Sequence, residues 1–204
     1  IEWTVSSYGN YTLPAGAYYL STDLTPDYMI QTNGNVTLCL NGHSITANHD
    51  GDVIAVNSGV TFTLTDCKGG NSNAEFGKIT HASGKDGRGV YVFKRSTTFN
   101  MYGGSITGNS VTDTRTNFGD GGGVFVYGTN GSFTMTGGEI TGNSATNRGG
   151  GVLMLNTPMT VSGNVQIRDN WKNGTLSGGV YVKGGDDSSA NNLYLRDTEN
   201  KKRT

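Results

Sequence analysis

The sequence predicts an all-β fold, a right-handed parallel β-helix (a solenoid) of about five to six coils with three short strands in each coil. Three observations predict it. Short segments that alternate apolar and polar residues recur along the chain, and they are rich in β-branched and aromatic residues. The same order of segments returns every 27–34 residues. Gly accounts for 33 of the 204 residues, which is too frequent for helices.

The clearest repeat extends from Phe133 to Leu155. It contains Gly-Gly-Glu-Ile-Thr-Gly-Asn and then Gly-Gly-Gly-Val. The segment from Phe99 to Tyr127 has the same pattern 34 residues earlier, and a weaker copy begins at Met159. In a parallel stack with about 4.8 Å between coils, like residues at equal offsets lie above one another, which antiparallel hairpins would not achieve.

Alignment of the repeats predicts three columns of inward-facing residues, one for each strand of a coil. For the first strand these are Leu38, Phe62, Phe99, Phe133 and Met159, followed two residues later by Leu40, Leu64, Met101, Met135 and Val161. For the second strand they are Ile45, Ile79, Ile106, Ile140 and Ile167. For the third strand they are Val90, Val124, Val152 and Val180, followed by Val92, Val126, Met154 and Val182.

Residues 1–34 repeat least, and we expect them to form an N-terminal cap and a first partial coil, because a terminal unit must finish one face against water. Residues 35–204 are expected to form the β-helix repeats. Their first full coil has strands at 36–40, 43–46 and 52–56, and a polar insert at 68–75 interrupts the next coil. We expect both ends to be cuts in a longer protein, with bare strand edges that allow end-to-end or lateral contacts between copies.

Asn109, Asn143 and Asn170 follow the second strand, and we expect them to form a ladder of turn residues. Asn tolerates left-handed backbone, and its amide can bond to the next coil. The Gly doublets and triplets predict corners that need positive φ or have no room for a Cβ. Cys39 and Cys67 lack the spacing of a metal or redox site. A disulfide and two partly buried free thiols both remain open for them, with the thiols favoured.

The formal net charge is −1, so the chain has no basic field that would attract nucleic acid or anionic lipid. No apolar run approaches the roughly 18 residues of a membrane span. The sequence therefore predicts neither nucleic-acid binding nor membrane insertion, and no cofactor is expected.

Four sequence motifs point to a known family of repeat proteins. They are Leu-Cys-Leu-Asn-Gly-His-Ser-Ile-Thr at 38–46, Leu-Thr-Asp-Cys at 64–67, and the Gly-Gly-x-Ile-Thr-Gly-Asn and Gly-Gly-Gly-Val units. The chain resembles, over about residues 11–195, the β-helical repeat regions of large surface proteins from Gram-positive, often gut-dwelling, bacteria. These belong to the pectate-lyase-like superfamily of right-handed parallel β-helices. The resemblance implies an extracellular, cell-wall-associated, adhesin-like module of a larger protein.

The same superfamily includes pectate-lyase-like and polygalacturonase-like enzymes, and a shared fold does not decide between binding and catalysis. A lyase of this type needs several acids around Ca²⁺ and an Arg or Lys base, whereas a hydrolase needs carboxylates within about 5–10 Å. The candidate acids, which occupy different phases of the coil, are Asp66, Glu75, Asp86, Asp120, Glu139 and Asp169. The best acid–base patch combines Asp86 and Asp120 with Arg88 and Arg148, and a solvated ion-pair cluster is its favoured interpretation. His43 and His81 have no evident Ser or Cys partner.

The alternation that turns Val90 and Val92 inward turns a column of large side chains outward on the third strand. A stack of this kind is unusual on a soluble monomer. We predict that it binds sugar rings or a protein; covering by another domain, a homodimer contact and lateral packing between coils are the alternatives. The predicted binding residues are Tyr91, Phe93, Phe125, Tyr127, Leu153 and Tyr181, with Leu155 beside them.

The sequence thus favours a non-catalytic extracellular surface module that binds a glycan, or a host or cell-wall protein, or that acts as a rod-like spacer. The alternative is a polysaccharide-active enzyme, either a lyase or a glycoside hydrolase.

Overall fold

The computed structural model describes residues 4–5, 9–68, 75–93, 95–115, 119–174, 179–183, 193–196 and 202–203, with side chains from 9 to 68, 75 to 93, 95 to 115, 119 to 174 and 179 to 180. Within these residues there is no helix, and the strands form one 17-stranded sheet and one 3-stranded sheet. Apart from short antiparallel pairs at the two ends, all pairings are parallel. The chain is therefore all-β and dominated by parallel strands, an arrangement compatible with the predicted β-helix.

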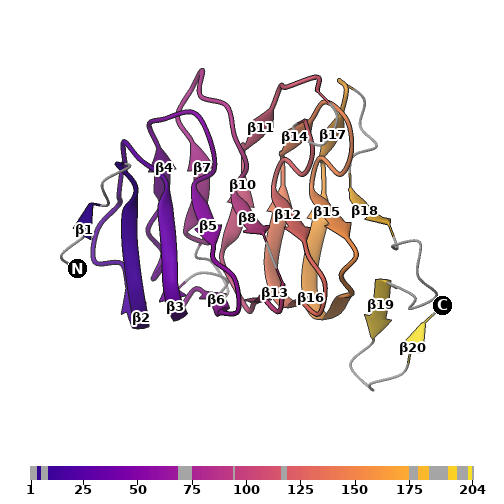
Figure 1. The fold of residues 1–204 in the computed structure, drawn as a ribbon, viewed down its shortest axis with the longest axis horizontal. Helices are drawn as coiled ribbons and strands as arrows, with labels where there is room; N and C mark the ends of the chain where they lie inside the picture. Colours follow the sequence, from indigo (N-terminus) through magenta and orange to yellow (C-terminus); the bar gives the residue numbers. More distant parts are fainter. Residues whose placement is uncertain are drawn as a thin grey trace.

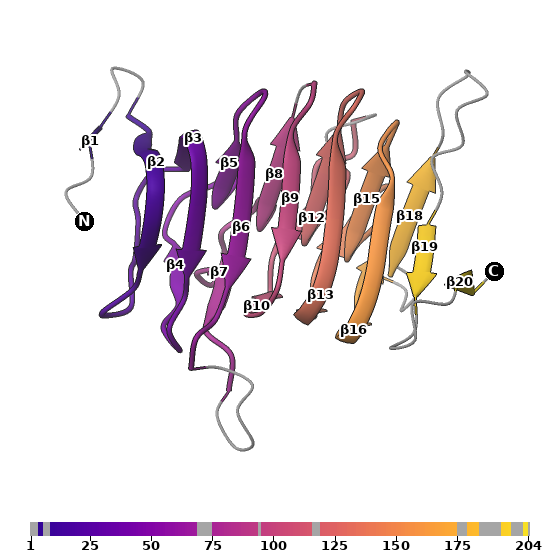
Figure 2. The same cartoon turned by 90° about the horizontal axis from the view of Figure 1, so that it is seen from below.

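The strands lie side by side along the long axis of the molecule, in three stacks that the chain visits in turn (Figures 1 and 2). We call one pass through the stacks a repeat. The first-strand stack contains β6 (Thr61–Thr65), β9 (Thr98–Met101), β13 (Ser132–Thr141), β16 (Met159–Arg168) and β19 (Leu193–Arg196). The second-strand stack contains β4 (Ile45–Ala47), β7 (Lys78–His81), β10 (Ser105–Thr107) and the C-terminal halves of β13 and β16. The third-strand stack contains β5 (Ile54–Val56), β8 (Val90–Phe93), β12 (Val124–Tyr127), β15 (Val152–Leu155) and β18 (Val180–Lys183).

The remaining strands of the 17-stranded sheet begin or end these stacks. β2 (Tyr11–Tyr19) pairs in parallel with β3 (Ile30–Cys39). The N-terminal part of β3 then pairs in parallel with β5, and its C-terminal part pairs with β6. Parallel stacking therefore already begins within the segment 1–34. β2 continues through Gly16, because a register shift between Pro14 and Gly16 accommodates an extra residue without ending the pairing with β3. The short strands β11 (Ser110–Val111), β14 (Ser144–Ala145) and β17 (Trp171–Lys172) form the separate 3-stranded sheet. β1 (Thr4–Val5) and β20 (Lys202–Arg203) pair antiparallel with β2 and β19.

The strand register confirms the predicted isoleucine and valine columns. In the second-strand stack, Ile106 lies opposite Ile79 on one side and Ile140 on the other. In the third-strand stack, Val124 lies opposite Val90 and Val152. Like residues thus lie above like residues, and a chain that is only 33% hydrophobic fills a continuous interior between the three stacks.

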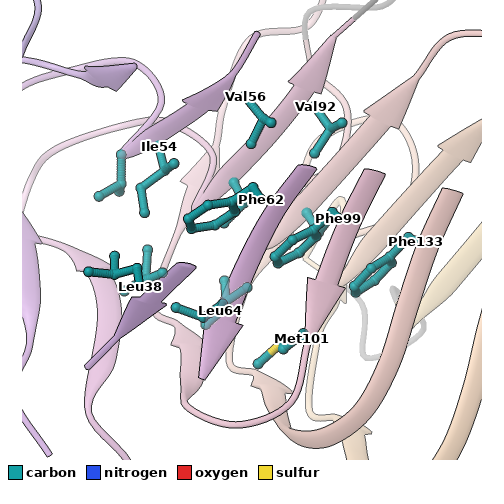
Figure 3. Close-up of a cluster of buried hydrophobic side chains, with 14 of the residues drawn as sticks. Leu38, Ile54, Val56, Phe62, Leu64, Val92, Phe99, Met101 and Phe133 are labelled. Atoms are coloured by element: carbon teal, nitrogen blue, oxygen red, sulfur yellow. The ribbon is translucent and has the colours of Figure 1, made fainter. Parts of the chain in front are cut away.

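Three phenylalanines run through this interior one above the other (Figure 3). The rings of Phe62 and Phe99 have centroids 5.5 Å apart, and those of Phe99 and Phe133 are 4.7 Å apart and nearly parallel. All three side chains are fully buried. The first-strand column is wrong at one place, because Val36 lies opposite Phe62, and Leu38 lies opposite Leu64 rather than Phe62. A shift of two residues keeps the same side chains inward, so alternation alone cannot detect it.

The predicted asparagine ladder is present and fully buried. Asn109 Nδ2 donates to Asn143 Oδ1 at 3.0 Å, and Asn143 Nδ2 donates to Asn170 Oδ1 at 3.1 Å. Each amide also donates to the backbone of the preceding repeat, for example from Asn143 to the carbonyl oxygen of Ile106. His81 extends the ladder, with Nδ1 2.8 Å from Asn109 Oδ1 and Nε2 2.8 Å from the carbonyl oxygen of Gly51. These bonds satisfy buried polar groups that would otherwise destabilise the fold.

The ladder explains why glycine precedes the third strand. A Cβ at Gly123 would lie 2.5 Å from the carbonyl oxygen of Gly151 and 2.9 Å from Asn143 Nδ2. Gly151 has the same constraint against Asn170 in the next repeat. At Gly149, by contrast, the backbone itself requires glycine, because its φ is +58°. Both predicted reasons for the Gly-Gly-Gly units therefore hold.

Cys39 and Cys67 are joined by a disulfide, which corrects the expectation that free thiols are favoured. Cys39 pairs in register with Thr65, so Cys67 lies just beyond it in the next repeat. The two Cα atoms are 6.2 Å apart, within the range that a disulfide spans. The two cysteines are 28 residues apart in the sequence, so they become neighbours only when adjacent repeats stack.

Candidate functional site

The outward side of the third-strand stack carries a cluster of large apolar side chains, which we call the aromatic face. Its described side chains belong to Tyr91, Phe93, Phe125, Tyr127, Leu153 and Leu155. It is separate from the main interior, to which Val90, Val92 and their counterparts contribute. Tyr181 occupies the next position of the column, opposite Leu153, but its side chain lies outside the described residues.

Four rings of the aromatic face pack against one another. Tyr91 lies 5.4 Å from both Phe93 and Phe125 between ring centroids, and Phe93 lies 5.6 Å from Tyr127. These distances fall within the range of favourable aromatic pairs. The rings come from β8 and β12, where Tyr91 is opposite Phe125 and Phe93 is opposite Tyr127, so strand register alone brings them together.

Exposure differs sharply across this face. Phe125, Leu153 and Leu155 are buried although they point away from the main interior, and Tyr91 is half-buried. Phe93 and Tyr127 remain 39% and 40% exposed. The surface open to a ligand is therefore the edge formed by Phe93 and Tyr127, while the other side chains of the face pack beside it. Burial raises the pKa of the Tyr91 phenol to about 12.

Arg88 joins the aromatic face to a buried charge cluster. Its guanidinium carbon lies 4.9 Å from the Tyr91 ring centroid and 5.2 Å from that of Phe125, a cation–π arrangement. The same side chain pairs with Asp52 at 3.2 Å and donates from Nε to the carbonyl oxygen of Asp120. Burial raises the pKa of Asp52, although the neighbouring Arg88 acts in the opposite direction.

Arg148 and Asp120 form a second buried pair in the following repeats. Arg148 donates from Nε to Asp120 Oδ1 at 3.1 Å and from a terminal nitrogen to Oδ2 at 2.6 Å, and the Asp120 side chain is fully buried. The prediction of an ion-pair cluster is therefore confirmed for Asp120 and Arg148, but the pair is largely buried rather than solvated. Asp86 instead accepts a hydrogen bond from the backbone of Thr112 at an exposed turn. The two aspartates that the sequence grouped together thus have different environments.

Asp52 is the member of this cluster that sequence reasoning missed. It lies two residues before Ile54, and Arg88 lies two residues before Val90; Ile54 and Val90 are paired in register. The column alignment would therefore have placed the two charges in adjacent repeats, had it been extended two residues upstream of the strand.

The other candidate acids are dispersed. Asp66 accepts hydrogen bonds from the backbone amides of Gly42, Lys68 and Gly77, which fixes a turn. Asp169 pairs with its neighbour Arg168. Glu75 and Glu139, by contrast, line a common groove on the outward side of the second-strand stack.

The two histidines singled out in the sequence have structural partners. His43 pairs with Asp23 at 3.3 Å near the surface, and His81 belongs to the asparagine ladder. Across the described residues, no group of three or more His, Cys, Asp or Glu is placed to hold a metal ion. Nor does this part of the chain contain a helix long and apolar enough to cross a membrane.

Comparison with known proteins adds no assignment. No protein family, curated protein or solved structure matches the chain. The function is therefore argued from the arrangement of the side chains.

Proposed function

We propose that this chain is a non-catalytic glycan-binding module of an extracellular bacterial surface protein, built as a right-handed parallel β-helix. The observation that carries the proposal is the edge of the aromatic face, where Phe93 and Tyr127 remain about two-fifths exposed next to a packed apolar cluster. Aromatic ring faces carry partial negative charge and attract the C–H groups of a sugar ring. The Tyr127 hydroxyl adds a donor and an acceptor at the same edge.

The rigid support of this edge favours binding. Phe125, Leu153 and Leu155 are packed beside it, and Arg88 lies over the rings of Tyr91 and Phe125. A ligand that meets pre-organised side chains loses little further conformational freedom, which improves affinity. The buried ion pairs nearby support a non-catalytic module, because Asp52 and Asp120 are engaged by Arg88 and Arg148 and serve the packing of this face.

The disulfide supports the extracellular part of the proposal. Disulfides form and persist in oxidising compartments and are rare in the cytosol. The Cys39–Cys67 bond reaches the surface at Cys67, where a reducing cytosol would have access to it. Alkylation of the natural protein without reductant should leave both cysteines unmodified, and modification of both would contradict the localisation.

The decisive experiment compares glycan-array binding of the wild type with the double variant Phe93→Ala/Tyr127→Ala. We expect the wild type to bind a defined set of glycans and the double variant to lose that signal. A matched control, Tyr19→Ala/Tyr102→Ala, removes two exposed tyrosines that do not belong to the aromatic face and should leave binding unchanged. If no glycan binds the wild type, or if the double variant binds as well as the wild type, the proposal fails and the spacer role is favoured.

A further inference from the structure

The outward side of the second-strand stack carries a second array of aligned side chains, which we call the polar face. Ser105 on β10 is in register with Lys78 on β7 and with Glu139 on β13. An ammonium group, a hydroxyl and a carboxylate therefore follow one another in adjacent strands. With about 4.8 Å between strands, the row is about 10 Å long.

A groove opens along this row. It has a volume of about 340 Å³ and is lined by Glu75, Phe76, Lys78, Ser105, Thr107 and Glu139. Ligand sites in proteins commonly have volumes of about 300–1,000 Å³, so the groove is large enough for a small ligand. It lies on a different stack from the aromatic face and shares no residue with it.

Ser105 is the observation that points to a ligand. Its side chain is fully buried and lines the groove, yet among the described residues its Oγ has no hydrogen-bond partner. A buried hydroxyl without a partner destabilises a protein, and alanine would fit the same strand without this cost. The hydroxyl becomes favourable if a bound molecule supplies the missing partner, which it would reach by parting the flexible Lys78 and Glu139 side chains on either side.

The charges of the groove indicate the class of ligand. Lys78 pairs with Glu75 at 3.4 Å near the surface. Glu139 is half-buried, and among the described residues no ion pair or hydrogen bond of its carboxylate is found. Two carboxylates against one ammonium group favour a positively charged ligand and disfavour an acidic one.

We propose that this groove binds an oligosaccharide that carries free amino groups. The sugar's ammonium group pairs with Glu139, its hydroxyl groups bond to Ser105 and Thr107, and Phe76 forms an apolar wall. This site is additional to the aromatic face and does not depend on glycan binding there.

The test measures binding of a fully deacetylated chitosan oligosaccharide by isothermal titration calorimetry. Its N-acetylated counterpart and an oligogalacturonate of the same length serve as neutral and acidic comparators. We expect the free-amine probe to bind best and the acidic probe not to bind. Glu139→Gln should weaken binding of the free-amine probe by about tenfold or more, because it removes a charge-assisted hydrogen bond. Binding that is strongest for the acidic probe, or undetectable for the free-amine probe, would overturn the proposal.

Two further variants keep the result interpretable. Ser105→Ala should weaken binding of the free-amine probe while the melting temperature rises or stays the same; a lower melting temperature would show that the hydroxyl is structural and would contradict the proposal. Asp27→Asn, at an exposed carboxylate outside the groove, should bind like the wild type. The Phe93→Ala/Tyr127→Ala variant should also retain this binding, since loss in that variant would assign the probe to the aromatic face.

Discussion

The aromatic face and the polar face are built on the same repeats and by the same rule, yet they have opposite properties. In both, side chains from successive strands point outward and lie in register. On the aromatic face, the outward side chains of Leu153 and Phe125 are only 0% and 4% exposed. On the polar face, Lys78, Thr107 and Glu139 remain half-exposed. Stacking in register therefore places side chains of one kind next to one another. An outward column of apolar residues forms a second core, and an outward column of polar residues retains hydrogen-bonding groups that can contact other molecules.

The largest expected difference between the two faces concerns their ion pairs. Arg88→Ala leaves Asp52 buried without its partner, and we expect the free energy of unfolding to fall by about 3–5 kcal/mol. Lys78→Ala breaks the exposed pair with Glu75 and should change it by less than about 1 kcal/mol. Urea denaturation of both variants measures the contrast. Equal losses would mean that burial does not distinguish the two faces.

The next effect concerns outward side chains of the two stacks. Phe125→Ala removes a buried ring from β12, and we expect a loss of about 3 kcal/mol in the free energy of unfolding, as for a residue of a main core. Thr107→Ala on β10 should change it by about 0.5 kcal/mol or less. The measurement is again chemical denaturation. A loss at Phe125 as small as that at Thr107 would show that the aromatic face does not act as a second core.

The smallest effect is a pH dependence confined to the aromatic face. Burial raises the pKa of Tyr91 to about 12 in the folded state, above the value of about 10 for an unfolded tyrosine. Tyr91 therefore contributes stability that is fully present below about pH 10 and is lost as the pH rises through about 12. The difference in ultraviolet titration between the wild type and Tyr91→Phe should have its midpoint near pH 12, and the variant should lose less stability over this range. A difference midpoint near pH 10 would show that the Tyr91 hydroxyl is hydrated.

The features that repeat could be predicted from the sequence. The columns through Ile106 and Val124 and the ladder through Asn143 follow from equal offsets and from alternation, because the same residue type recurs at the equivalent position of several repeats. Features that occur once could not be predicted in this way. The two-residue shift at Leu38 preserves the inward orientation, and the disulfide at Cys39 depends on a contact between repeats.

The candidate sites could be predicted from the sequence only in part. Alternation correctly separated Tyr91 and Phe125 from the valines of the main interior. It could not show that Phe125 would be buried while Phe93 stays open, because exposure depends on neighbouring side chains and loops. The groove at Ser105 was missed for the same reason: an unpaired hydroxyl is visible only when all its neighbours are placed.

The asparagine ladder has a consequence for how such a chain changes length during evolution. Each amide donates to the next Asn along the chain, so the array has one direction and every internal unit presents the same donor and the same acceptor. Duplication or deletion of one whole unit therefore leaves matching groups on both sides of the junction. The molecule can be lengthened or shortened by recombination in whole units without redesign of its interior.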